Sequence, residues 1–260
     1  MSFFSGGNMK VIFNADDFGL TEGVNHGIVE SHRNGVVNST TMMVGVASEE
    51  HALTLSREYP NLKVGLHLRF TMGAPLTNHT CLYGEGGHFP GLDTFWDKQD
   101  FETSAVHDEV VAQVEYFLSM GLSLSHIDSH HHAHSHPQIG PVVEKIAKLY
   151  GVPVRSFGGA GIDIDGCRYL FTDKFYGNQV DLDTLIVHLL SLKGTYDLVE
   201  VMCHPAIVDD ALEQVSSYRE PRHKELTILT NPRLKERLLT RGIKITDYSE
   251  LDFMHHKDCV

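Results

Sequence analysis

The sequence predicts an α/β fold built on a parallel sheet, and two observations carry this prediction. Seven short segments rich in β-branched and apolar residues alternate along the chain with segments of helical periodicity. These strand-like segments alternate only weakly between polar and apolar residues, as expected when both faces of a strand are covered. A doubly wound open sheet and a closed or nearly closed barrel both fit, and 260 residues are enough for one such domain.

The first half of the chain supplies four predicted strands and three predicted helices. The strands are expected at 10–15, 36–46, 62–70 and 122–128, and the helices at 21–33, 48–60 and 101–120. Thr21 is a predicted helix N-cap, whereas Pro60 and Gly121 are expected to end helices. Residues 71–100 are rich in Gly, Asn, Pro and His, which predicts a long and therefore functional loop.

The second half continues the same alternation. A helix at 137–150 ends at Gly151, and a strand at 152–157 leads into a second irregular loop at about 158–180. Further elements are expected as helices at 182–193 and 221–241 and as strands at 196–205 and 243–248. No repeat or linker divides the chain, so we expect one domain over 10–255, with residues 1–9 as a leader outside the fold.

Composition excludes several classes of partner. The formal net charge is -13, with 34 acidic against 21 basic residues, and no run of Lys or Arg stands out. Nucleic acid and acidic membrane surfaces are therefore not expected as partners. The four cysteines are scattered without a CxxC pair, which fits free thiols in a reducing cytoplasm. No apolar run approaches the roughly 20 residues that a membrane span needs.

Reactive side chains stand at the carboxyl ends of five predicted strands, where α/β folds place their sites. They are Asp16 and Asp17, His67, Asp128 with His130, Arg155, and His204. The amino ends of these strands carry no comparable set. The pattern therefore predicts an active site at one edge of the sheet.

Each of these residues also has an ordinary structural interpretation. Two adjacent acids after a strand often cap a helix, and a lone histidine in an apolar strand, such as His67 or His204, is often satisfied by backbone. If Asp16 and Asp17 point in different directions, one carboxylate can bind a metal while the other acts as a base. Arg155 is expected either in an ion pair that orients an acid or on a polar substrate.

The stretch from His126 to Pro137, "HIDSHHHAHSHP", contains six histidines. In an extended chain His130, His132 and His134 share one side, so spacing alone leaves the ligand open among them. Asp128 is placed to hold a ligating imidazole through its second nitrogen. One aspartate and two histidines from separate strands form a three-ligand site with open positions, which suits zinc, manganese, iron, cobalt or nickel, whereas magnesium usually prefers more oxygen.

Several long motifs resemble the YdjC-like carbohydrate deacetylases, and most of all the chitooligosaccharide deacetylases among them. These motifs are "NADDFGLTEGVNHGIVESHRNGVVNSTTMMV", "VGLHL" with "TMGAPL", "HIDSHHHAHSHPQIGPVVEKIAKLYGVPVR" and "EVMCHPA". The resemblance covers the chain from about Lys10 to Tyr248. It implies an irregular (β/α)7 barrel resembling the polysaccharide deacetylases.

The resemblance also implies roles for the residues that match the motifs. Asp17, His67 and His130 would bind one divalent metal ion, magnesium or zinc, with Asp128 behind a ligand. Asp16 would be the base and His204 the acid that protonates the leaving amine. Arg155 would orient Asp16 or bind the substrate. The substrate would be a small acetylated oligosaccharide, chitobiose or its 6-phosphate, and a cytoplasmic homodimer is expected by family.

Two other interpretations stay open at this point. The "HAH" at 132–134 has the HxH form of metal-dependent amidohydrolases and phosphoesterases. The histidine-rich segment also fits a metal-buffering or sugar-binding protein without catalysis. That second interpretation leaves the reactive residues on the other strand ends unexplained. The roles of His131, His132, His134 and His136 stay undetermined by the sequence.

Overall fold

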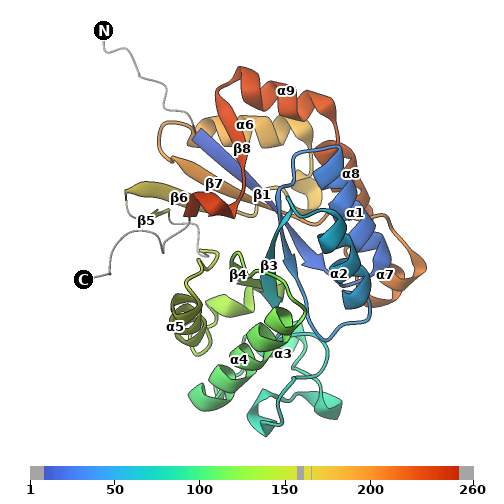
Figure 1. Ribbon diagram of the computed structural model, residues 1–260, viewed down its shortest axis with the longest axis vertical. Helices are drawn as coiled ribbons and strands as arrows, with labels where there is room; N and C mark the ends of the chain where they lie inside the picture. Colours follow the sequence, from blue (N-terminus) through green and yellow to red (C-terminus); the bar gives the residue numbers. More distant parts are fainter. Residues whose placement is uncertain (1–8, 157–160, 165, 252–260) are drawn as a thin grey trace.

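The computed structural model describes residues 9–156, 161–164 and 166–251, which form one mixed α/β layer structure (Figure 1). The strands are β1 (Met9–Phe18), β2 (Ser39–Met42), β3 (Lys63–Leu68), β4 (Ile127–Ser129), β5 (Ile162–Ile164), β6 (Cys167–Thr172), β7 (Leu198–Cys203) and β8 (Ile243–Thr246). The longer helices are α1 (Glu22–Arg33), α2 (Glu49–Glu58), α4 (Thr103–Ser119), α5 (Gly140–Tyr150), α6 (Leu182–Leu192), α8 (Glu220–Leu229) and α9 (Pro232–Thr240). Two short ones are α3 (Leu92–Phe95) and α7 (Asp210–Val215).

The strands join in one curled sheet in the order β4-β3-β2-β1-β7-β6-β5, with β8 beside β1. All pairs are parallel except β5 with β6. On one side of β1, β8 pairs with residues 9–12 and β2 with residues 14–18, so two strands share that edge. The predicted α/β barrel class is confirmed, in the form of a half-barrel that stays open between β4 and β5.

The helices cover the outer face of this sheet, and the main apolar core lies between the two layers. In β1, Phe13 and Ala15 point to the helices, whereas Ile12 packs inside the curl against a smaller cluster that includes Tyr169 and Tyr248. Strand periodicity then places Asn14 and Asp16 on the inner face with Ile12. The carboxyl end of β1 thus delivers its polar side chains to the concave side.

Most helix predictions are confirmed. Thr21 caps α1 and its hydroxyl accepts from the backbone N of Val24, and Gly151 ends α5 with φ +68°. Met9, assigned above to the leader, is the first residue of β1 and is buried. Residues 1–8 and 252–255 lie outside the described residues. No helix in the described part of the chain is long and apolar enough to cross a membrane.

Two predictions in the middle of the chain need correction. The expected loop at 158–180 contains the β5–β6 hairpin, and β6 pairs in parallel with β7. Of the expected strand at 152–157, Val154 forms a single bridge to Ile127, and Pro153 and Arg155 hydrogen-bond to the same residue. That short bridge is enough to bring Arg155 beside β4.

Candidate metal centre and active site

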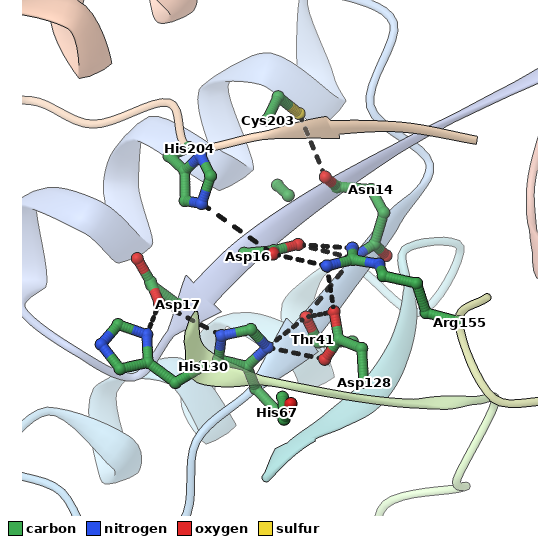
Figure 2. Close-up of polar contacts among 12 residues, drawn as sticks. Asn14, Asp16, Asp17, Thr41, His67, Asp128, His130, Arg155, Cys203 and His204 are labelled. Carbon is green, nitrogen blue, oxygen red and sulfur yellow. Dashed lines mark hydrogen bonds and ion pairs between the residues drawn. The ribbon is translucent and has the colours of Figure 1, made fainter. Parts of the chain in front are cut away.

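The strand ends meet at one cavity of about 650 Å³. Its lining includes five of the predicted site residues, namely Asp16, Asp17, His67, His130 and His204. Asp128 and Arg155 lie behind this group and contact it from the interior of the curl (Figure 2). The structure therefore brings together all seven residues singled out from the sequence.

Asp17, His67 and His130 form a compact donor group. Asp17 Oδ1 lies 3.3 Å from His67 Nε2 and 2.9 Å from His130 Nδ1. One ligand atom from each residue falls within 4.8 Å of the others. Burial raises the pKa of Asp17, but the Arg222 guanidinium and the His130 ring hold it well below its usual range. The carboxylate is thus ionised and ready to bind a cation.

The second nitrogen of His67 is fixed from behind. His67 and Asp128 are register partners of β3 and β4, and the imidazole Nδ1 donates to Asp128 Oδ1 over 2.6 Å. This bond directs Nε2 toward Asp17, as in metal sites where a carboxylate orients a ligating histidine. Burial lowers the pKa of His67, but the Asp128 and Asp17 carboxylates raise it to about 10. A cation among the three donors would take the place of the Nε2 proton.

A second group of possible metal donors, Asp16, His67 and Asp128, is already neutralised. Arg155 Nη1 lies 2.7 Å from Asp16 Oδ2 and 2.8 Å from Asp128 Oδ2, so a guanidinium fills the place of a cation. In the group of Asp17, His67 and His130, a guanidinium (that of Arg222) pairs with Asp17 Oδ2, and Asp17 Oδ1 stays directed at the two imidazoles. These three residues fit one divalent ion.

Asp16 is held by a bidentate ion pair. The two terminal nitrogens of Arg155 each donate to one Asp16 oxygen over 2.7 Å, and Asn14 adds a bond of 3.0 Å. Burial raises the pKa of Asp16, but Arg155 lowers it well below the usual range. Arg155 Nε binds Glu200 over 2.8 Å, and the side chain does not line the cavity. Of its two predicted roles, this geometry favours orienting Asp16 over binding substrate.

His204 follows β7 on the opposite wall. Its Nε2 lies 3.9 Å from Asp16 Oδ2, and its backbone N donates to Glu225. The ring meets the edges of Tyr176 and Tyr218 at 5.6 and 5.7 Å, and these two tyrosines stack on each other at 4.2 Å. Burial lowers the pKa of His204 to about 4, although the Asp16 charge opposes the shift. His204 is therefore neutral at pH 7 in the free protein.

Three histidines of the "HIDSHHHAHSHP" stretch pack in the protein interior. His126 stacks on Tyr248 at 3.6 Å, and His134 Nδ1 pairs with the Ser129 hydroxyl over 2.6 Å. His136 packs among aromatic side chains of the 92–101 segment. These contacts place the three rings in the interior, away from the donor group of Asp17, His67 and His130.

His131 and His132 lie on the cavity wall beside His130. His131 Nδ1 pairs with the Thr71 hydroxyl over 2.9 Å, and the His132 ring meets the edge of Phe171 at 5.6 Å. Burial lowers the pKa values of both, of His131 to about 4 and of His132 to about 2. Neutral rings at this place shape the cavity without adding charge.

Four residues of the site escaped the sequence argument: Tyr176, Tyr218, Arg222 and Glu225. Three of them come from the segment after β7, in which the sequence predicts only a helix at 221–241. In this architecture every segment that follows a parallel strand reaches the site edge. An arginine and a tyrosine in "SSYREPRH" at that position were therefore the available signal.

The chain is similar to known proteins along nearly its whole length. The family model described as YdjC-like protein matches residues 10–240. A carbohydrate deacetylase of Vibrio vulnificus strain CMCP6 is 60% identical over 252 residues, covering 97% of this chain and 100% of its own. A crystal structure from Enterococcus faecalis V583, of a protein assigned by name to cellobiose-phosphate cleavage, has a TM-score of 0.85 at 31% identity and covers 95% of this chain and 100% of that one.

A more distant structure shares the fold alone. The Xyl-CE4 domain of a xylanase from the hindgut metagenome of Trinervitermes trinervoides has a TM-score of 0.51 at 12% identity. It covers 94% of this chain and 90% of that one. The barrel architecture predicted from the sequence is therefore shared with this CE4 domain.

Proposed function

The chain belongs to the YdjC-like family and is a carbohydrate deacetylase, a hydrolase, and from this premise we propose its substrate and mechanism. It removes the N-acetyl group from N-acetylglucosamine units of small chitooligosaccharides, chitobiose or its 6-phosphate, and releases acetate. The observation that carries the proposal is the group of Asp17, His67 and His130 beside Asp16 and His204 in one cavity. A volume of about 650 Å³ suits a ligand of this size.

Asp17, His67 and His130 hold one divalent ion, zinc or magnesium. Two imidazole nitrogens and one carboxylate oxygen favour zinc of the two, because magnesium prefers an all-oxygen shell. Such an ion supplies a Lewis acid that polarises the acetyl carbonyl and lowers the pKa of water.

Asp16 accepts the proton of the attacking water. Arg155 fixes the carboxylate in the geometry of its bidentate pair, so that its orientation is set before substrate arrives. His204 then protonates the leaving nitrogen. Because His204 is neutral in the free protein and its Nε2 lies 3.9 Å from Asp16 Oδ2, the proton that Asp16 accepts passes to His204 and on to the amine. The reaction therefore consumes one amide and one water and yields one acetate and one amine.

The stacked rings of Tyr176 and Tyr218 form an aromatic wall beside His204. Tyr176 is 44% exposed and offers an apolar surface to a sugar ring. Glu225 fixes this wall, because it accepts from the Tyr218 hydroxyl over 2.6 Å and from the backbone N of His204. The aromatic wall therefore fixes the position of the sugar ring relative to the proton donor, His204.

Removal of the metal tests the proposal directly. Protein stripped with a chelator and assayed for acetate release from chitobiose and its 6-phosphate is expected to be inactive, and added zinc or magnesium is expected to restore activity. Phosphate release, measured in the same reactions, is expected to be absent. Undiminished deacetylation by rigorously metal-free protein would overturn the mechanism.

The substitution Asp16→Asn separates the base from the metal. Asparagine keeps the shape of the side chain but accepts no proton, so kcat is expected to fall by roughly 10²–10⁴-fold, the usual contribution of a general base. Metal content is expected to stay at one ion per chain, because Asp16 is not in the donor group. Loss of the metal from this variant would instead place Asp16 among the ligands.

A further inference from the structure

Arg222, in the first turn of α8, is a buried cation on the wall of the catalytic cavity. Its Nη2 lies 2.5 Å from Asp17 Oδ2, and its Nε donates to the Tyr218 carbonyl over 2.9 Å. Its third nitrogen, Nη1, is buried and has no hydrogen-bond partner among the residues that the structure describes. Two of the three guanidinium nitrogens thus have partners in the protein, and the N–H groups of Nη1 have none among the described residues.

Arg155 offers a comparison within the same site. All three of its nitrogens are used, Nε by Glu200 and the two terminal nitrogens by Asp16, and it does not line the cavity. A buried donor without a partner costs about 1–3 kcal/mol, and more on a charged group. Arg222 carries this cost at Nη1, and the residue lines the cavity in which the reactive side chains meet.

The position of Arg222 is fixed from two sides. Its backbone carbonyl accepts from the Ala206 N over 3.3 Å, which ties the start of α8 to the segment that follows His204. Its guanidinium carbon lies 5.6 Å from the centre of the Tyr218 ring. The spare Nη1 donor is therefore held in place and does not depend on a mobile side chain.

We infer that Arg222 has two roles in the deacetylase, of which the second rests on the proposed function. Nη2 holds Asp17 Oδ2, so that Oδ1 alone faces His67 and His130. Nη1 donates a hydrogen bond to an oxygen of the bound sugar substrate. Since Asp17 already balances the charge of Arg222, the acceptor that fits is an uncharged carbonyl or hydroxyl oxygen and not a phosphate.

Three variants separate these roles. Arg222→Lys keeps a cation for Asp17 but lacks the second arm of the fork, and Arg222→Met removes both donors. Arg168→Lys is the matched control, because Arg168 is half exposed and pairs with Asp197 far from the cavity. Zinc affinity is measured by calorimetry on metal-free protein, KM and kcat are measured with chitobiose and its 6-phosphate, and thermal unfolding monitors the fold.

Arg222→Lys is expected to bind zinc within a few-fold of the wild type while KM rises about tenfold for both sugars, the equivalent of one hydrogen bond of about 1.4 kcal/mol. Arg222→Met is expected to weaken zinc binding by about 10–100-fold, the usual cost of losing a residue that holds a ligand. Guanidinium ion added to Arg222→Met is expected to restore part of the lost zinc affinity and part of the lost affinity for the sugar substrate. The control is expected to match the wild type throughout.

Unchanged KM in both Arg222 variants would overturn the substrate contact, and unchanged zinc affinity in Arg222→Met would overturn the hold on Asp17. A rise in KM confined to the 6-phosphate would overturn the assignment of an uncharged oxygen. If Arg222→Met fails to fold, Arg222→Lys still decides the substrate contact. A wild-type protein that releases no acetate from either sugar contradicts the proposed function, and the zinc titrations then decide the Asp17 role independently.

Discussion

Three described residues other than glycine have positive φ, and all three belong to the site. Asp17 has φ +72°, His131 +53° and His132 +55°. An L-residue in this region costs roughly 1–2 kcal/mol, so the surrounding contacts have to hold it there. At Asp17 these contacts are the two histidines and Arg222, and at His131 the Thr71 hydroxyl. The positive φ of Asp17 turns its carboxylate away from that of Asp16, whereas the rings of His130 and His131 stay in contact at 3.8 Å.

The pair His130 and His131 gives a residue-level prediction. His130→Asn is expected to lower zinc affinity by more than the roughly 10–100-fold cost of losing a partner of a ligand, because a ligand itself is lost. His131→Asn is expected to keep one tightly bound ion, since asparagine tolerates positive φ and His131 contacts Thr71 instead. Metal content and affinity, measured on both dialysed proteins, check this. Equal losses in the two variants would contradict it.

Residue identity within the histidine stretch is where sequence reasoning reaches its limit. Strand spacing grouped His130, His132 and His134, but the chain leaves β4 at Ser129 and turns at once into a 3-10 segment, His130–Ser135. Alternation then no longer applies, and His134 turns inward onto Ser129. The motif resemblance named His130, which the structure places against Asp17. Spacing alone had no means to make that choice.

At the scale of elements, the alternation of side chains along a strand explains how the reactive side chains are directed into the cavity. Inner positions of β7 carry Glu200 under Arg155 and Met202 on the cavity wall, and His204 follows at the same spacing. The sequence predicted β7 and β1 because their apolar residues are continuous. It missed the antiparallel pair of β5 and β6 because these strands are short and partly polar.

Helix α1 supports His204 from outside the sheet, which gives a prediction about packing. A Cβ at Gly27 would lie 2.4 Å from the Ala206 Cα, well inside van der Waals contact. Gly27→Ala is therefore expected to cost about 1–3 kcal/mol by overpacking, although alanine is the better helix former. Displacing the His204 segment by about 1 Å is expected to lower kcat by about 10²-fold.

The matched control is His26→Ala, on the exposed side of the same helix. It is expected to change neither the unfolding temperature nor kcat by a comparable amount. Thermal unfolding and acetate release measured on both variants check the prediction. A Gly27→Ala protein with wild-type stability and rate would show that α1 does not position His204.

At the scale of the whole molecule, the unusual feature is a polar interior inside the half-barrel. Asn14 links His126 to Asp16, and Arg155 joins Asp16 to Glu200 in a continuous buried network. The apolar core lies outside it, between sheet and helices. Composition does not reveal which polar residues are buried, so the sequence predicted the outer layer well and the inner network only where it ends at the cavity.

Burial within this site makes the stability of the whole fold depend on pH. Glu225 is buried, and burial raises its pKa to about 8 even though the Tyr218 hydroxyl and the His204 backbone N oppose the shift. An unfolded glutamate has a pKa of about 4.3, so between that pH and about 8 the folded state binds more protons than the unfolded state. This contribution therefore lowers stability as pH rises through the window, by up to about 1.4 kcal/mol per pH unit.

Glu225→Gln removes the titration while keeping an acceptor of similar shape. The difference in unfolding free energy between variant and wild type is expected to grow in favour of glutamine from pH 5 to pH 8 and to level off above it. A rearranged hydrogen bond adds a constant offset, which leaves this slope untouched. Thermal or denaturant unfolding of both proteins across that range measures it. A difference that is constant with pH would mean that Glu225 is ionised throughout, with the Arg222 charge, which lowers its pKa, outweighing burial.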